Sequence, residues 1–267
     1  MLLEDADIIT IGLLLSQERL AALQNLTGST RIAIELHQAT LSLNADLMNV
    51  IASIELALRN TVYDNLTVYF RGPDWLVRPR APFKWKKTEN TNVKKALDSA
   101  QRAEYAKMTQ AQKGALDTLA YPHGRPPNSS PYNRAVDRRR QIDVSDGKII
   151  AETTLYFWKR LFGPDYEQTL WRTTLKKTFP NKLLKRSDVA DKLEDIYQAR
   201  NRLAHHEPVL HKRFRDTLAA IEFIAENLGR PSPSKDSPLF KLIADDLRAT
   251  KHKAEALHDR LATFRKA

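Results

Sequence analysis

The amino-acid sequence predicts an all-α protein, a helical bundle with additional helices at the N- and C-terminal ends. Apolar residues recur at steps of three and four along most of the chain, which is the spacing of helices that bury one face. No run shows the apolar and polar alternation of a half-buried strand. Glycine and proline fall between the periodic segments, where they end helices.

The first part of the chain predicts three helices after a short apolar run. The run at 8–15 follows acidic residues and is shorter than the roughly 20 residues of a membrane span, so we expect it to pack inside the protein. Ser16 can cap the first helix, which ends at Gly28. The expected helices include residues 17–26, 43–66 and 93–119.

A proline-rich stretch at about 121–146 interrupts the pattern and predicts a surface loop or hinge. Helical spacing then returns. The expected helices cover residues 149–161, 166–175, a segment opened by Ser187, 209–228 and 238–265. The last is charged on most sides and is expected to lie on the surface or against a partner. We therefore assign residues 1–230 to one helical domain and 231–267 to a C-terminal helical extension.

The chain is basic, with a formal charge of +11, and it contains no cysteine. The absence of cysteine excludes disulfides, a thiolate nucleophile and cysteine-ligated metals, and it fits the cytoplasm. The basic residues are concentrated mid-chain, where aromatic residues are interleaved, a composition that suits RNA with stackable bases. The alternative is a solvated surface with the aromatics in the core. The residues concerned are Arg78, Arg80, Lys84, Lys86, Lys87, Lys94 and Lys95, with Trp75, Phe83 and Trp85 between or beside them.

The segment after Ser187 carries the candidate chemistry. Arg200 continues an apolar stripe and therefore needs a partner, whereas Asn201 and His205 are four apart and share another face. Pro208 disfavours helical geometry before it, which places the histidine near the negative end of the helix dipole. Cleavage of RNA by its own 2′-hydroxyl needs proton transfer and stabilisation of a phosphorane, tasks suited to histidine and arginine without a metal.

Residue types alone leave other interpretations open. Histidines and arginines at a helix end are more often an ion-pair network or a cap. A metal site is not expected, because adjacent histidines on a helix point apart and no carboxylate pair is spaced to complete it. The histidines considered are His205, His206 and His211.

Residues 200–208, Arg-Asn-Arg-Leu-Ala-His-His-Glu-Pro, closely resemble the arginine-x4-histidine signature of HEPN domains, in the form found in Abi-like (abortive-infection) proteins. Further segments resemble that family in order, and the similarity spans about residues 15–212. They are residues 15–20, 55–60, 157–162 and 170–180. The resemblance implies an all-helical bundle, usually dimeric, with two copies of the signature facing one another across a cleft. It also implies metal-independent endoribonuclease activity, without a cofactor, in phage defence or a toxin–antitoxin system.

By this resemblance Arg200 and His205 are the catalytic pair, and Asn201 is the polar residue that follows the arginine. The Abi-like extension is expected to orient the site or hold phosphate; its residues are Arg202, His206 and Glu207. Glu55 and Arg59 are supporting candidates, either as a buried pair or with Glu55 as the counter-charge of Arg200; a local structural salt bridge is the alternative. RNA contacts are expected from Lys84, Lys86, Lys87, Arg138, Arg139 and Arg140.

Helical geometry raises one difficulty, since five residues at about 100° each leave Arg200 and His205 roughly 140° apart. Either the helix frays before Pro208, the arginine side chain bends round, or the two groups meet across a dimer.

The expected partners are RNA, a second copy of the chain and an antitoxin protein or RNA, with no membrane. Two further hypotheses are a non-catalytic HEPN module that binds RNA or a protein, and a toxin that is neutralised by modification near its active site.

Overall fold

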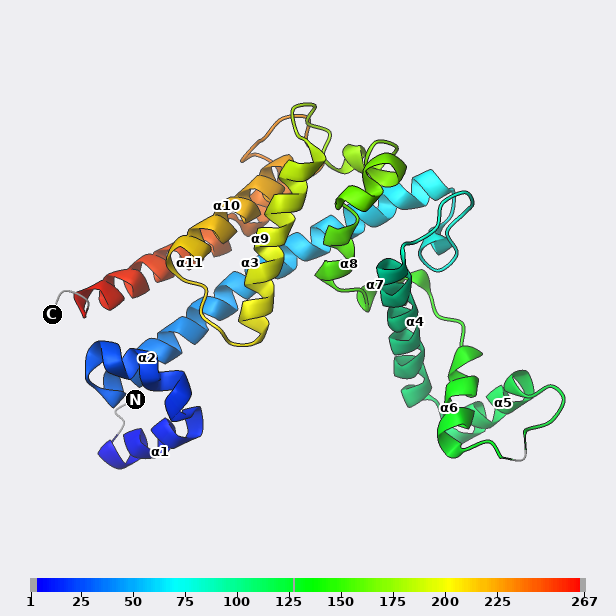
Figure 1. The fold of residues 1–267 in the computed structure, drawn as a ribbon, viewed down its shortest axis with the longest axis horizontal. Coiled ribbons are helices and arrows are strands. Elements are labelled where there is room, and N and C mark those ends of the chain that lie inside the picture. The colour runs from blue at the N-terminus through cyan, green and yellow to red at the C-terminus, as the bar shows by residue number, and fades with distance from the viewer. Residues whose placement is uncertain (1–3, 127, 265–267) are drawn as a thin grey trace. The chain divides into compact units, whose positions relative to one another are not determined.

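The computed structural model describes residues 4–126 and 128–264, and within these ranges every regular element is a helix (Figure 1). The prediction of an all-α protein is therefore confirmed. The chain forms two compact units. One combines the segment up to Leu58 with the segment from Phe179 onward, and the other comprises Arg59–Thr178. This division does not follow the boundary expected at residue 230.

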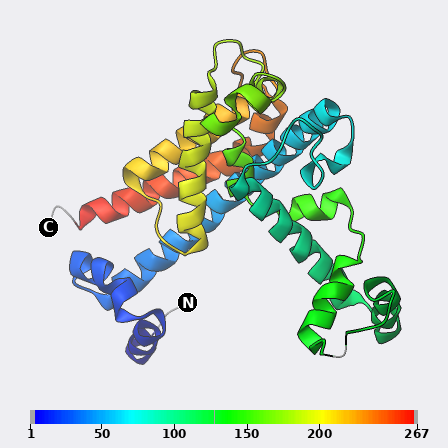
Figure 2. The same cartoon turned by 45° about the vertical axis from the view of Figure 1, so that its right-hand side comes forward.

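The first unit contains the candidate signature. Its helices are α1 (Asp5–Leu15), α2 (Gln17–Thr27), the first part of α3 (Thr30–Phe70), α9 (Arg186–Ala204), α10 (His211–Asn227) and α11 (Pro238–Thr263). Helix α10 packs against both α9 and α11 (Figures 1 and 2). As expected, the side chain of Ser16 caps α2 by accepting a hydrogen bond from the backbone of Arg19, and Gly28 ends the helix in the left-handed conformation.

Helix α3 supplies the apolar seam that its sequence predicts. Leu43, Leu47, Val50, Ile54 and Leu58 follow the helical spacing and are fully buried. By length and composition α3 could also cross a membrane. That is weak support for a membrane span, because the buried core helix of a water-soluble protein meets the same criterion.

Helix α11 differs from the expectation of a charged surface helix, since one face of it is buried. Its buried residues are Ile243, Leu247, Thr250, Ala254, Leu257 and Leu261. They recur at steps of three and four, so α11 forms part of the core of the first unit. Charged residues on the remaining sides hide this stripe in the sequence. Arg265, the expected end of the helix, lies outside the described residues.

The second unit contains the end of α3 and a series of shorter helices. They are η1 (Pro73–Leu76), α4 (Lys87–Lys107), α5 (Gln110–Ala120), α6 (Pro131–Arg140), α7 (Asp146–Ala151), α8 (Leu155–Arg160), η2 (Pro164–Tyr166), η3 (Glu167–Trp171) and η4 (Leu175–Thr178). Of these, η1, η2 and η4 are 3₁₀ turns and η3 is π-helical.

Two expectations for this unit are wrong in detail. The single helix expected at 93–119 is two helices, because Thr109 and Gln112 form a capping box that starts α5. The stretch at about 121–146, expected to be a loop or hinge, contains α6, which Ser130 caps. None of the α6 residues is buried, so no apolar periodicity in the sequence predicts this helix.

Large aromatic residues form the core of the second unit. Trp75, Phe157, Trp158 and Tyr166 are almost completely buried, and Trp171 is 6% exposed, which confirms the interpretation of the Trp158 and Trp171 region as core. The indole N–H of Trp158 donates to the hydroxyl of Thr153 at 2.8 Å, so its polar atom is satisfied.

Candidate active site

The candidate signature lies where α9 ends. Helical geometry continues through Ala204, and His206 then adopts the left-handed conformation with φ 57°. The backbone N–H of His206 donates to the carbonyl of Leu203 at 3.0 Å, and that of Glu207 donates to the carbonyl of Arg202 at 2.8 Å. These two bonds satisfy carbonyls that the helix end would otherwise leave open, as in a Schellman motif. The turn expected before Pro208 is therefore present.

The three proposed catalytic residues are accessible and uncommitted. Arg200 and Asn201 are half-buried and His205 is exposed. Within the described ranges, no hydrogen bond or ion pair engages the side chains of Arg200, Asn201 or His205. Arg200 thus lacks the internal partner that its place on the apolar stripe led us to expect.

Two contacts stabilise the turn itself. Arg202 and Glu207 form an ion pair at 3.1 Å, which spans the turn on the surface. Asn44 of α3 donates from Nδ2 to the backbone carbonyl of Glu207 at 3.2 Å. Asn44 is 5% exposed, so this bond ties the turn to the buried side of the longest helix of the first unit.

The two expected supporting residues, Glu55 and Arg59, fall in different units. Glu55 belongs to the first unit, and among the described residues it makes no ion pair or hydrogen bond with Arg200. Arg59 belongs to the second unit, where its guanidinium donates to the carbonyl of Ile150 at 3.5 Å. Among the described residues, Glu55 is therefore not the counter-charge of Arg200.

The regular end of α9 also bears on the divergence of Arg200 and His205. The backbone is helical up to Ala204, so the Cα–Cβ bond of His205 still leaves the helix about 140° from that of Arg200. Early fraying of the helix does not bring the two groups together. The reach of the long arginine side chain and contact across a dimer are the remaining routes.

A pocket of about 370 Å³ lies beside the turn, within the first unit. Its lining combines residues of α2, α3 and α11 with residues that follow α9: Arg19, Ala22, Leu23, Leu26, His37, Thr40, Leu41, His206, Pro208, Leu210, His211 and Leu261. His37 is 8% exposed and its Nδ1 has no hydrogen-bond partner in the described structure. Burial, followed by the positive charge of Arg19, lowers the pKa of His37.

Sequence reasoning missed His37 and Asn44, although both leave a trace. They are polar residues seven apart on α3, and seven residues are about two helical turns, so they share a face. Asn44 directly follows the buried Leu43, and His37 directly follows the buried Leu36. A polar residue on an otherwise apolar face was the available signal.

The basic residues expected to contact RNA fall into two groups. Lys84, Lys86 and Lys87 are exposed, and within the described part of the unit their side chains form no ion pair. Arg138 and Arg139 are each 13% exposed at the side chain and are occupied by carboxylates. Only the first group presents free positive charge.

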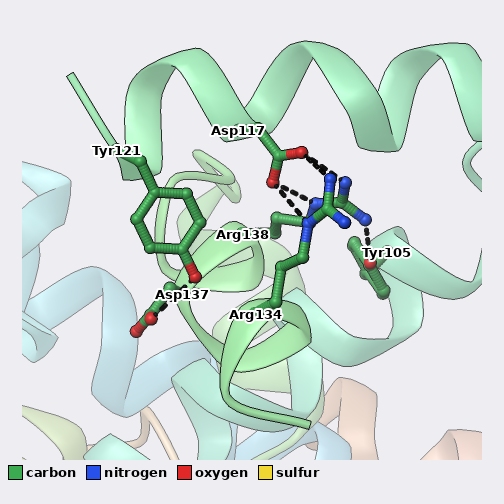
Figure 3. Close-up of polar contacts among 6 residues, drawn as sticks. All are labelled: Tyr105, Asp117, Tyr121, Arg134, Asp137 and Arg138. Atoms are coloured by element: carbon green, nitrogen blue, oxygen red, sulfur yellow. Dashed lines mark hydrogen bonds and ion pairs between the residues drawn. The ribbon is translucent and has the colours of Figure 1, made fainter. Parts of the chain in front are cut away.

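The arginines instead join helices (Figure 3). Arg138 of α6 donates to both carboxylate oxygens of Asp117 in α5, at 2.7 and 2.6 Å, and Arg134 donates to the same carboxylate. These hydrogen bonds hold the pKa of Asp117 well below its usual range. Arg139 pairs with Asp98 of α4 at 3.6 Å. Arg140 is more exposed and pairs with Asp137 at 3.4 Å.

The aromatic residues interleaved with the lysines are packing residues. Trp75 is fully buried, and Trp85 is half-buried with its indole N–H donating to the carbonyl of Leu76 at 2.9 Å. Phe83 is half-buried against Trp85, with ring centroids 4.9 Å apart. The alternative of aromatics in the core therefore describes this region better than a stacking platform for bases.

In the residues that the structure describes, no group of three or more histidine, aspartate or glutamate side chains is arranged to hold a metal ion. Comparison of the chain with protein-family models, with curated proteins and with solved structures gave no match. The resemblance to HEPN proteins accordingly rests on the residues quoted above.

Proposed function

We propose that the chain is a metal-independent endoribonuclease of the HEPN type. The observation that carries the proposal is the Arg200–His205 signature at an accessible helix end, with both side chains uncommitted to internal partners in the described structure. A half-buried arginine without an internal counter-charge is available to pair with an anionic ligand. A phosphate group of RNA is an anion of the appropriate kind.

In this proposal the 2′-hydroxyl of RNA attacks the neighbouring phosphorus, and the P–O5′ bond breaks. The products are a 2′,3′-cyclic phosphate and a free 5′-hydroxyl. His205 acts as general base towards the 2′-hydroxyl or as general acid towards the leaving 5′-oxygen. Arg200 stabilises the charge that develops on the phosphorane, and Asn201 positions the histidine or the phosphate. Solvent or a second histidine carries out the other proton transfer, so that one proton leaves the 2′-hydroxyl and one is added to the 5′-oxygen.

We further propose that a homodimer assembles the complete site. The divergence of Arg200 and His205 supports this, because a second copy could supply one of the two groups to the same phosphate. The ion pair of Arg202 with Glu207 would hold the turn in position, and His206 would contact the substrate beside it. Lys84, Lys86 and Lys87 would attract the RNA backbone.

The resemblance suggests a role in phage defence or in a toxin–antitoxin system in the cytoplasm, with an antitoxin protein or RNA as a further partner. The alternative is a non-catalytic module that binds RNA or a protein. One observation favours this alternative. Three apolar residues of α1 are exposed, Ile9 to 68%, Leu13 to 69% and Leu14 to 79%. Exposed apolar residues that lie together mark sites of protein interaction.

Cleavage of RNA by purified variants tests the proposal. We expect His205→Ala and Arg200→Ala each to lower the cleavage rate at least about 100-fold. The matched controls are His252→Ala and Arg248→Ala, which remove exposed residues of the same types from α11 and should retain activity. Cleavage should persist in EDTA. Full activity of either signature variant, or a requirement for a divalent metal, would contradict the mechanism.

A further inference from the structure

The pocket beside the α9 turn has the features of a ligand site. Its volume of about 370 Å³ falls within the range of small-molecule sites, roughly 300–1,000 Å³. Four helices of the first unit and the turn itself contribute to the lining, so the pocket is formed by the fold of that unit. The turn residues His206 and Pro208 form part of it and follow His205 directly in the chain.

The lining matches a flat ring with a polar edge. Leu23 and Leu26 come from α2, Leu41 from α3 and Leu261 from α11, and these side chains provide apolar surface. His37, His206 and His211 also line the cavity and bring imidazole rings to its wall. Nucleobases have apolar faces and hydrogen-bonding edges, and proteins bind them with this combination of stacking and polar contacts.

His37 is the observation that points most directly to a ligand. Its side chain is more than nine-tenths buried and lines the cavity, yet Nδ1 has no hydrogen-bond partner among the described residues. A buried polar atom in this state costs free energy unless something completes its hydrogen bond. Burial, followed by the charge of Arg19, lowers the pKa of His37 and so favours the neutral imidazole, which has one N–H and one lone pair.

We propose that this pocket is a nucleobase-binding subsite, which takes the base of an RNA nucleotide next to the phosphate at Arg200 and His205. Exposed Arg19 lines the pocket and would contact a flanking phosphate. The inference rests on the proposed nuclease function, since it identifies the base with part of the substrate. It adds a reason for the enzyme to cut at particular nucleotides.

Binding is measured with a hexanucleotide whose 2′-hydroxyls are methylated, so that it cannot be cleaved, and with versions that lack one base. Loss of the base at one position should weaken binding about tenfold, the order expected for a base held by stacking. Leu41→Trp, which fills the pocket, should weaken the full oligonucleotide about tenfold and abolish the effect of the missing base. Leu56→Trp, at an exposed position on the same helix, is the control and should behave as wild type.

His37→Phe provides a second variant with a ring of similar size and no nitrogen atoms. It should fold, since it removes an unsatisfied buried atom, and should weaken the oligonucleotide about fivefold. Free nucleoside monophosphates form a separate arm. If they require the open pocket for binding and the oligonucleotide does not, the pocket binds free nucleotides and the RNA subsite is refuted.

The inference is also overturned if no missing base matters, or if the effect persists in Leu41→Trp. Cleavage of unmodified RNA separates this failure from that of the proposed function. A Leu41→Trp protein that binds and cuts RNA as wild type does would refute the subsite and leave the nuclease intact. A wild-type protein that binds the base in the pocket but cuts no RNA would refute the nuclease and leave base binding established.

Discussion

Asn44→Leu tests whether the turn after α9 must be held in place for catalysis. Asn44 reaches from α3 to the backbone carbonyl of Glu207, two residues beyond His205. Leucine has a similar size and no polar atoms, so the substitution removes the bond without opening a large cavity. It therefore separates the anchoring of the turn from the packing of the core.

The expected loss of stability is small. Loss of the hydrogen bond costs about 0.5–1.5 kcal/mol. The Oδ1 atom of Asn44 is buried and has no partner in the described structure, so its removal relieves a desolvation cost of about 1–3 kcal/mol. Because the two effects oppose one another, we expect the free energy of unfolding to change by between a loss of about 0.5 kcal/mol and a gain of about 2.5 kcal/mol.

The expected change in activity is larger. A displacement of a catalytic group by about 1 Å can lower a rate roughly 100-fold, and an unanchored turn permits displacements of that order at His205. We therefore expect single-turnover RNA cleavage to fall at least about tenfold. Urea unfolding followed by circular dichroism measures the stability of the same preparation.

Asn49→Leu is the matched control. Asn49 is on the same helix and donates to Asp246 at 3.1 Å, but on the surface and away from the turn. It should lose little activity. Wild-type cleavage by Asn44→Leu would refute the anchoring role, and a loss of stability above about 3 kcal/mol would show that Asn44 is needed for the fold instead.

Three further predictions concern the rest of the chain. Burial, followed by the charges of His211 and Arg215, lowers the pKa of His258, so below about pH 6.5 the unfolded chain binds more protons than the folded chain. The first unit should therefore lose stability as the pH falls through about 6.5, and the loss should be smaller in His258→Gln. Urea unfolding at pH 5 and pH 8 measures both. Asp117→Asn removes the negative charge and one of the two oxygens that accept from Arg134 and Arg138, so the backbone amides of α5 and α6 should exchange hydrogen faster. Protection equal to wild type would contradict this. Replacing the exposed residues Lys84, Lys86 and Lys87 by alanine should weaken RNA binding. The slope of log affinity against log salt concentration should fall by an amount corresponding to up to three released ions. Arg138→Ala should instead lower the free energy of unfolding and leave this slope unchanged.

The sequence predicts those parts of the fold that depend on local spacing. The seam of α3, the cap of α2 and the turn before Pro208 each follow from residues within a few positions of one another. Helix α6 escaped prediction because it buries no residue, and the break between α4 and α5 escaped because apolar spacing outweighed the cap at Thr109.

The surroundings of the candidate site depend on distant parts of the chain and could not be predicted in the same way. Asn44 and Glu207 are 163 residues apart, and no local pattern pairs them. The carboxylates that occupy Arg138 and Arg139 come from neighbouring helices, so a basic cluster in the sequence became a structural network. The signature itself is local, and its position at the end of α9 agrees with the sequence.

The central claim is that Arg200 and His205 cleave RNA through attack by the 2′-hydroxyl. The most direct measurement is to incubate the purified protein with total RNA in EDTA and to map the ends of the products. We expect 2′,3′-cyclic phosphate and 5′-hydroxyl ends that disappear with His205→Ala. Intact RNA, 5′-phosphate ends, or the same products from the variant would contradict it.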